Sequence, residues 1–220
     1  MKIMAVSDKV LDHLYCSDVK QRYPNVDLLI GCGDLPFYYL EFLVSAFDRR
    51  MVYVLGNHDK GPQYTVEGRV LKEVNGGIDI HARAVHMNGL LIAGLEGSMR
   101  YRPNRPFMYT EAEMRANIGR LLPRLLRNRV KHGRYLDILV THSPPFGIHD
   151  QPDLPHTGFK IFLSFLEWFK PTYMLHGHIH LYRRDTVRVS RYDETTIINV
   201  YPYFVFDFHT PPLLSEQPAL

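Results

Sequence analysis

Gly56-Asn57-His58-Asp59 follows residues 51–55, an apolar run that is typical of a buried strand. The glycine ends this strand, and an amide, an imidazole and a carboxylate come directly after it. Ligand crevices of α/β sheets open at the carboxyl ends of strands, so these side chains are in a position suited to chemistry. Asn, Gly and Asp are also common turn residues, so the stretch by itself favours an ordinary polar turn. The choice between the two interpretations depends on whether similar side chains follow other strands.

Metal-donor side chains do follow the other predicted strands. The further strand candidates are residues 2–6, 26–30, 136–140 and 173–175. The donors that follow the strands are Asp8, Asp34, Asn57, His142, His178 and His180. Taken singly, each has a plain alternative as a helix cap, a loop residue or a hydrogen-bonded surface group. Together they favour one common site, because neighbouring strands lie only about 4.8 Å apart.

The mixture of donors indicates which cofactor such a site would take. Carboxylate, amide and imidazole ligands together suit Mn²⁺, Fe or Zn²⁺. A carboxylate such as Asp34 can bridge two ions roughly 3.5–4 Å apart, which is the spacing of a two-metal hydrolytic site. The sequence therefore predicts divalent metal ions, up to two per chain, and a positive charge that would attract phosphate.

The order of predicted elements indicates the class of fold. Helical spacing of apolar residues predicts helices over residues 11–24 and 37–47, between the first three strands. Strands that alternate with helices in this way imply parallel βαβ units. Asn88-Gly89 predicts a hairpin in the middle of the chain. Thr110 and Glu113 form a capping-box pattern at the start of a further helix, in which Pro123 is a candidate kink. The remaining predictions are a helix over residues 158–169 and closing strands over residues 187–189, 195–200 and 204–208.

Length and composition limit the other possibilities. The chain has 220 residues, which suits one domain, predicted over residues 1–209, with a loose proline-containing tail over 210–220. The formal net charge of +3 does not suggest a surface that coats nucleic acid. Two cysteines, Cys16 and Cys32, give no disulfide framework. Neither a signal peptide nor a membrane span is expected, so we predict a cytoplasmic protein without a membrane or nucleic-acid partner.

Four short blocks, taken in order, resemble the calcineurin-like metallophosphoesterase superfamily. They are Gly33-Asp34, Gly56-Asn57-His58-Asp59, Thr141-His142 and Gly177-His178-Ile179-His180. The resemblance extends from the first strand to about Phe208. It implies an α/β fold, namely a four-layer αββα sandwich of two mixed β-sheets flanked by helices, with the site at the strand ends.

The resemblance also implies roles for individual residues. Asp8, Asp34 and His180 would bind the first metal ion. Asp34, Asn57, His142 and His178 would bind the second, so that Asp34 bridges the two. His58 would assist the leaving group as a catalytic acid, paired with Asp59. The implied reaction is hydrolysis of a phosphomonoester or phosphodiester by a hydroxide that bridges the metals, manganese being one suitable ion.

One position departs from the family pattern. The first block should read Asp-x-His, but here Val10 follows Asp8-Lys9, and valine cannot bind a metal. The first site is therefore expected to be weaker, with water, Asp12 or His13 as candidates to fill the vacancy. The second site is unaffected.

A basic loop is the candidate for binding substrate. Arg100, Arg102 and Arg105 lie in the helix-breaking stretch 100–106 and could contact phosphate, although a solvated loop would have the same composition. The expected substrate is a small phosphate ester or a nucleotide, and neither its identity nor the oligomeric state follows from the sequence. The alternative to an enzyme is a weakly active or inactive scaffold of this fold that binds a protein partner. Val10 favours the scaffold, and the intact His58 favours the enzyme.

Overall fold

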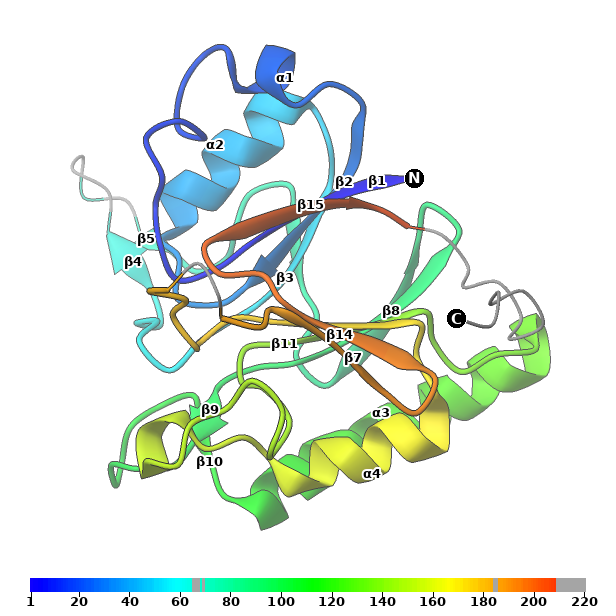
Figure 1. Ribbon diagram of the computed structural model, residues 1–220. Helices are drawn as coiled ribbons and strands as arrows, with labels where there is room; N and C mark the ends of the chain where they lie inside the picture. The colour runs from blue at the N-terminus through cyan, green and yellow to red at the C-terminus, as the bar shows by residue number, and fades with distance from the viewer. Residues whose placement is uncertain (65–67, 69, 184–185, 209–220) are drawn as a thin grey trace.

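The computed structural model describes residues 1–64, 68, 70–183 and 186–208, so the predicted tail lies outside the described residues. Two large sheets form the middle of the molecule (Figure 1). The five-stranded sheet has the order β15-β1-β2-β3-β6. Its strands are β1 (Lys2–Val6), β2 (Val26–Cys32), β3 (Met51–Val54), β6 (Gly77–Asp79) and β15 (Tyr203–Asp207).

The six-stranded sheet has the order β13-β14-β12-β11-β8-β7. Its strands are β7 (Arg83–Met87), β8 (Leu90–Leu95), β11 (Ile138–Thr141), β12 (Tyr173–His176), β13 (Val189–Tyr192) and β14 (Thr195–Asn199). Two short pairs complete the strands: β4 (Gln63–Tyr64) with β5 (Val70–Leu71), and β9 (Ser98–Met99) with β10 (Met108–Tyr109).

Helices cover the outer face of each sheet (Figure 1). α1 (Val19–Arg22) and α2 (Phe37–Phe47) lie over the five-stranded sheet, and α3 (Glu111–His132) and α4 (Lys160–Phe169) lie over the six-stranded sheet. One hydrophobic cluster fills the space between the sheets, and one lies under each helical layer. The predicted four-layer αββα sandwich is confirmed. In the part of the chain that is described, no helix is both long and apolar enough to cross a membrane.

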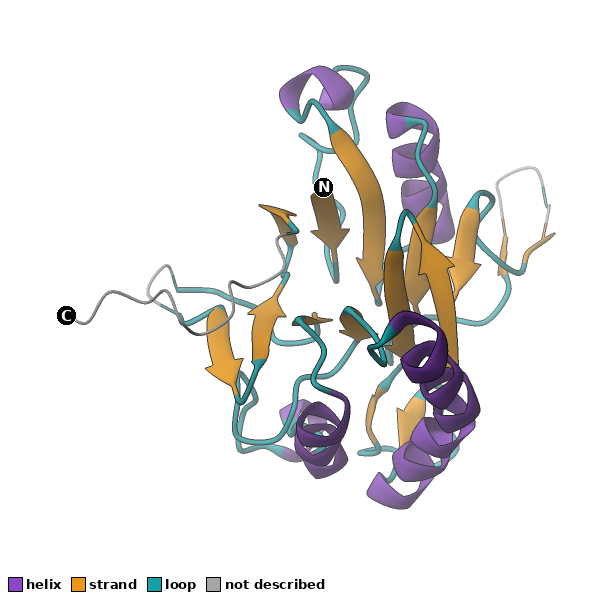
Figure 2. Ribbon diagram, turned by 90° about the vertical axis from the view of Figure 1, so that its right-hand side faces the viewer, coloured by secondary structure: helices purple, strands orange, loops and turns teal. Residues whose placement is uncertain are grey.

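The strand directions gather the candidate ligands. β1, β2 and β3 run parallel, and so do β8, β11, β12 and β14. Figure 2 shows the strands of the two sheets as arrows between the helices at the top and those at the bottom. Carboxyl ends of parallel strands meet at one edge of a sheet, so the loops after them are neighbours. The two sheets thus present their ligand-bearing loops to a common region.

Two local expectations have different outcomes. The predicted helix over residues 11–24 is wrong, because turns occupy most of this segment and α1 spans only Val19–Arg22. Ser17 and Asp18 have low helix propensity, which favours a helix start here over a helix interior. The Asp18 carboxylate accepts from Arg22 Nε at 2.7 Å and makes no cap hydrogen bond to the backbone of α1. The capping box of Thr110 and Glu113 is confirmed, and α3 continues through Pro123.

Candidate metal centre

Three of the predicted ligands follow their strands in left-handed backbone conformations. The φ angles are 64° at Asp8, 56° at Asp34 and 65° at His178. Asp and His tolerate this region better than most residues, and such strain tends to gather at functional sites. Each side chain is thereby turned away from its strand direction and towards the edge that the two sheets share.

Two glycines allow the ligand loops to approach one another closely. A Cβ atom on Gly56 would collide with the Asp34 carboxylate and come within 2.7 Å of the His142 ring. A Cβ atom on Gly177 would lie 2.5 Å from Oδ2 of Asp8. The glycines that begin Gly-Asn-His-Asp and Gly-His-x-His are therefore required by the packing of the ligands, not only by the turns.

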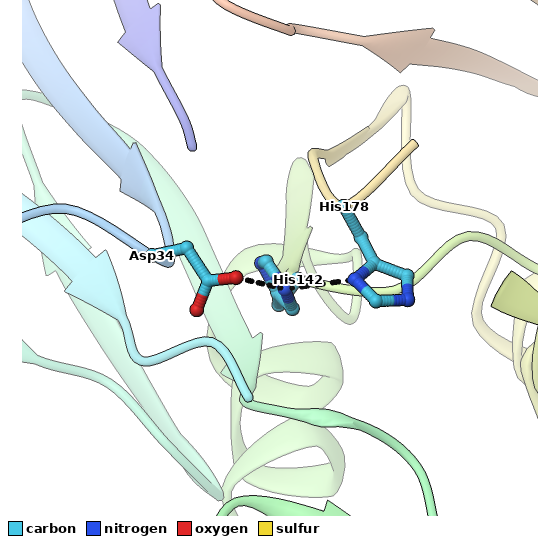
Figure 3. Close-up of side chains that lie close together, drawn as sticks. All are labelled: Asp34, His142 and His178. Carbon is cyan, nitrogen blue, oxygen red and sulfur yellow. Dashed lines mark hydrogen bonds and ion pairs between the residues drawn. The ribbon is translucent and has the colours of Figure 1, made fainter. Parts of the chain in front are cut away.

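Four predicted ligands converge on one point. His142 Nε2 lies 3.0 Å from Asn57 Oδ1, 3.1 Å from His178 Nδ1 and 3.3 Å from Asp34 Oδ2. Figure 3 shows the carboxylate of Asp34 and the ring of His178 on either side of His142. One ligand atom each of Asp34, His142 and His178 lies within 4.8 Å of the others. His142 is fully buried, and Asn57 and His178 are nearly so.

Backbone carbonyls fix which nitrogen of each histidine faces this point. The carbonyl of Cys32 lies 2.8 Å from His142 Nδ1, and that of Pro155 lies 2.8 Å from His178 Nε2. A carbonyl only accepts, so both of these nitrogens carry the proton, and in the neutral rings the opposite nitrogens offer lone pairs. Lone pairs of Asp34, Asn57, His142 and His178 then point at one another. A cation at this point would satisfy all four lone pairs, so the residues fit a divalent metal ion.

The charge balance without an ion leads to the same conclusion. Burial alone would lower the pKa of His142, but the negative charge and hydrogen bond of Asp34, with Asp8, raise it to about 9. Burial alone would raise the pKa of Asp34, but the charge of His142 lowers it to about 2. A proton on His142 therefore holds the place of a cation beside Asp34.

Asp8 and His180 lie beside this group and are less tightly assembled. His180 Nε2 is 3.6 Å from Asp8 Oδ1, and the other ring nitrogen of His180 contacts the Tyr182 hydroxyl at 2.9 Å. The His180 ring stacks on Tyr201 at 4.3 Å, and its side chain is 38% exposed. A pocket of about 300 Å³ opens here. Its lining is Asp8, Asp34, His58, Gln151, His156, His178, His180 and Tyr182.

Neither candidate substitute for the missing histidine lies at this pocket. Val10 packs half-buried against the core cluster beneath α2. His13 is exposed and packs edge-on against Tyr203, with ring centres 5.4 Å apart. Asp12 and His13 are both absent from the pocket lining around Asp8. Besides the predicted ligands and His58, the described polar side chains that line it are Gln151, His156 and Tyr182.

His58 and Asp59 follow Asn57 but have different surroundings. The His58 side chain is exposed and lies where three pockets meet, and its backbone N–H donates to Asp34 Oδ1 at 2.8 Å. Asp59 is buried and accepts from the backbone N–H groups of Gly56, at 2.7 Å, and Asp34, at 2.9 Å. Burial raises the pKa of Asp59 to about 6. Within the described residues, no hydrogen bond or ion pair joins Asp59 to the His58 imidazole, and the Asp59 carboxylate instead holds the backbone of two ligand loops.

The three arginines of the basic loop have different surroundings in the structure. Arg102 and Arg105 line a pocket of about 440 Å³ together with His58 and Lys60. Arg100 does not, because its guanidinium donates to the Met108 carbonyl and pairs with Glu113 of the capping box. Lys60 was missed from the sequence, although its place directly after Asp59 was the available signal.

Tyr101 connects this loop to the predicted metal ligand Asn57. Its hydroxyl accepts from Asn57 Nδ2 at 3.2 Å. With the amide nitrogen held in this way, Asn57 Oδ1 is the atom that faces His142. Tyr101 also lies beneath the guanidinium of Arg102, 5.5 Å from the ring centre.

Comparisons with known proteins agree with this geometry. Residues 5–182 match the calcineurin-like phosphoesterase family. A UPF0046 protein of Caenorhabditis elegans is 25% identical over 200 residues, which cover 82% of this chain and 63% of that protein. The chain thus spans less than two thirds of the length of this relative.

Solved structures support the fold alone. One crystal structure has a TM-score of 0.64 at 13% identity and covers 94% of each chain. TT1561 of Thermus thermophilus has a TM-score of 0.57 at 13% identity, covering 90% of this chain and 88% of that one. Vacuolar Protein Sorting 29 from Cryptosporidium parvum has a TM-score of 0.44 at 10% identity, covering 90% of this chain and 72% of that one, which is too low to bear on function. Because the family match covers most of the sequence, the chain belongs to the calcineurin-like phosphoesterase family.

Proposed function

We propose that this protein hydrolyses a phosphate ester with divalent metal ions held by the six predicted ligands. The observation that carries the proposal is the convergence of four lone-pair donors on one buried point, with each histidine oriented by a backbone carbonyl. Divalent ions held there would supply positive charge next to phosphate and lower the pKa of a bound water.

The remaining steps are assigned to side chains of this chain. His58 is exposed at the mouth of the pocket, so its imidazole is available to give a proton to the leaving oxygen. The Asp59 carboxylate accepts from the backbone N–H groups of Gly56 and Asp34, which holds the loop that carries Asn57 and His58 in position. The pocket with Lys60, Arg102 and Arg105 lies on the other side of His58 and suits an anionic part of the substrate.

The test combines metal analysis with a hydrolysis screen. The purified chain is stripped with a chelator, and Mn²⁺, Fe²⁺ or Zn²⁺ is added back. Hydrolysis of p-nitrophenyl phosphate and bis-p-nitrophenyl phosphate is then measured, followed by nucleotides. We expect metal-dependent hydrolysis of at least one ester. A chain that binds metal tightly and hydrolyses none of them would instead support the protein-binding scaffold that Val10 favours.

The basic pocket makes a separate prediction about substrates. Arg102→Ala with Arg105→Ala should raise KM for nucleotides with several phosphates by roughly tenfold, while p-nitrophenyl phosphate, which is too small to reach both sites, should be unaffected. Arg124→Ala with Arg127→Ala on the distant face of α3 is the matched control. Equal loss on all substrates would mean that the arginines support the loop rather than bind substrate.

A further inference from the structure

Helix α3 is apolar on two faces. The buried side chains that pack it onto the six-stranded sheet are Met114, Asn117, Ile118, Leu121, Leu125 and Asn128. On the outer face, Leu122, Leu126 and Val130 are 39%, 56% and 89% exposed. They are four residues apart, so they form one line along the helix. The folding of this domain does not account for the outer line, because the inner face alone buries the helix.

The outer line lies in a strongly basic segment. Residues 114–136 contain seven Lys and Arg residues and no Asp or Glu. The cations are Arg115, Arg120, Arg124, Arg127, Arg129, Lys131 and Arg134. At about 100° per residue, Arg120, Arg124, Arg127 and Lys131 fall on one side of the apolar line and Arg129 on the other. The outer face therefore combines a narrow apolar ridge with flanking positive charge.

Much of this charge is not neutralised by the protein itself. Arg134 pairs with Asp137, and Arg129 lies over the Tyr135 ring and donates to the Gly133 carbonyl. Four cations have no hydrogen bond and no ion pair within the described ranges. These four are Arg115, Arg124, Arg127 and Lys131, all of them exposed. An anionic partner is the natural complement of such a face.

We propose that the outer face of α3 docks on an anionic lipid surface. Leucine on one side and Lys and Arg beside it are the pattern of helices that lie in the headgroup region of a bilayer. Each cation near an anionic leaflet adds to the attraction. A second copy of this chain fits less well, because it would bring like charges together. Nucleic acid also fits less well, because phosphate contacts supply most of its affinity and the exposed leucines would not be buried.

This proposal differs from the expectation that the protein has no membrane partner. That expectation rested on the lack of a spanning segment, which a helix lying on a surface does not need. The proposal is also separate from the phosphoesterase proposal. The pockets around the metal centre contain no residue of α3, so a change on this face can be tested with the centre intact.

The experiment is co-sedimentation of the full chain with vesicles. Vesicles of phosphatidylcholine alone are compared with vesicles that also contain phosphatidylserine. We expect binding only to the anionic vesicles, and weaker binding at high salt. Leu122→Ser with Leu126→Ser, and separately Arg124→Glu with Arg127→Glu, should each lower the partition coefficient by about tenfold or more.

Matched controls separate this face from exposure or charge in general. Leu154→Ser replaces a leucine that is 56% exposed, as Leu126 is, on the short 3₁₀ helix Leu154–His156. Arg49→Glu with Arg50→Glu makes the same charge change beside α2, in the opposite helical layer. Both controls should bind like wild type. If the double leucine variant melts at a lower temperature than wild type, Leu126→Ser alone replaces it in the binding measurement.

Several results would overturn the proposal. They are equal binding to neutral vesicles, full binding by the leucine variant, and absence of binding to either vesicle. Retention on polyglutamate that depends on the leucines, without vesicle binding, would point to an acidic protein partner. A dimer in sedimentation that Leu122→Ser with Leu126→Ser abolishes would point to a second copy. Loss of vesicle binding with hydrolysis unchanged would confirm that the two sites are separate.

Discussion

The candidate metal centre has two halves, or groups of predicted ligands, which the fold brings together to different degrees. In one half, ligand atoms of Asp34, Asn57 and His178 lie 3.0 to 3.3 Å from His142 Nε2, and His142 is fully buried. In the other, Asp8 and His180 are 3.6 Å apart and His180 is 38% exposed. The first half has its rings fixed by main-chain carbonyls, whereas His180 is held by the side chains of Tyr182 and Tyr201.

The difference shows how a single substitution changes one half of a shared site. Val10 stands where the family pattern has a fourth ligand for the first ion, beside Asp8, Asp34 and His180, and its side chain packs against the core. The Asp34 half draws its ligands from other loops and is complete without position 10. We therefore expect the two halves to bind metal ions with unequal affinity.

Asp34→Asn should have the largest effect, because Asp34 is the only predicted ligand common to both halves. Both ions should be lost, and hydrolysis should fall by more than about 10³-fold. Metal content of the purified variant and its turnover check this. Asp48→Asn is a matched control, because Asp48 is exposed and also has a left-handed conformation, with φ of 53°. Full metal and activity in Asp34→Asn would remove the bridging assignment.

His58→Ala should leave the metal content of both halves unchanged and lower kcat. The expected loss in kcat is about 10²–10⁴, which is usual when a general acid is removed. Metal analysis beside steady-state kinetics separates the two roles, with exposed His86→Ala as the control. If metal content collapses in His58→Ala, His58 is a ligand and not the acid.

The pH dependence should distinguish the buried half. Without metal, His142 holds a proton up to a pKa of about 9, and an ion must displace it. The metal affinity of the Asp34 half should therefore fall as pH falls below 9, by up to about tenfold per pH unit. Between pH 8 and pH 6 the expected loss of affinity is roughly 10²-fold. Asp34, with a pKa of about 2, stays ionised throughout this range. Calorimetry in buffers of different ionisation enthalpy should show about one proton released, and a flat profile would contradict the assignment.

Val10→His should strengthen metal binding at the Asp8 half, which is the weaker of the two. Wild type should bind one ion tightly and one weakly. If the new imidazole points away from the core towards Asp8, the ratio of the two metal dissociation constants should fall by roughly tenfold in the variant. Mn²⁺ titration of both proteins, read by calorimetry and hydrolysis together, measures this. Two equally tight ions in wild type would mean that another pocket side chain completes the Asp8 half, and His156→Ala would then identify it or exclude it.

Tyr101→Phe should have the smallest effect. It removes only the hydroxyl that accepts from Asn57, so affinity at the Asp34 half should fall by a few-fold, in keeping with about 1 kcal/mol for one neutral hydrogen bond. Tyr38→Phe, at an exposed tyrosine of α2, is the control. No change in metal affinity would show that Asn57 is oriented without Tyr101.

The sequence by itself predicted most of the strands and the candidate ligands at their ends, and its resemblance to the family implied the sandwich. Buried strands leave a strong apolar signal, and ligands must be particular residue types placed where strands end, as in Gly-Asn-His-Asp and Gly-His-x-His. It did not predict the turns over residues 11–18, where the low helix propensity of Ser17 and Asp18 outweighs a weak helical spacing.

Only the tertiary structure decided how the side chains are used. His142 and His178 acquire their tautomers from the carbonyls of Cys32 and Pro155, which are far from them in sequence. Asp59 holds backbone amides rather than His58, and Arg100 is engaged by Glu113 while its neighbours face a pocket. Residue type limits what a side chain can bind, but the direction in which it points depends on backbone angles and on neighbours that the fold brings from distant parts of the chain.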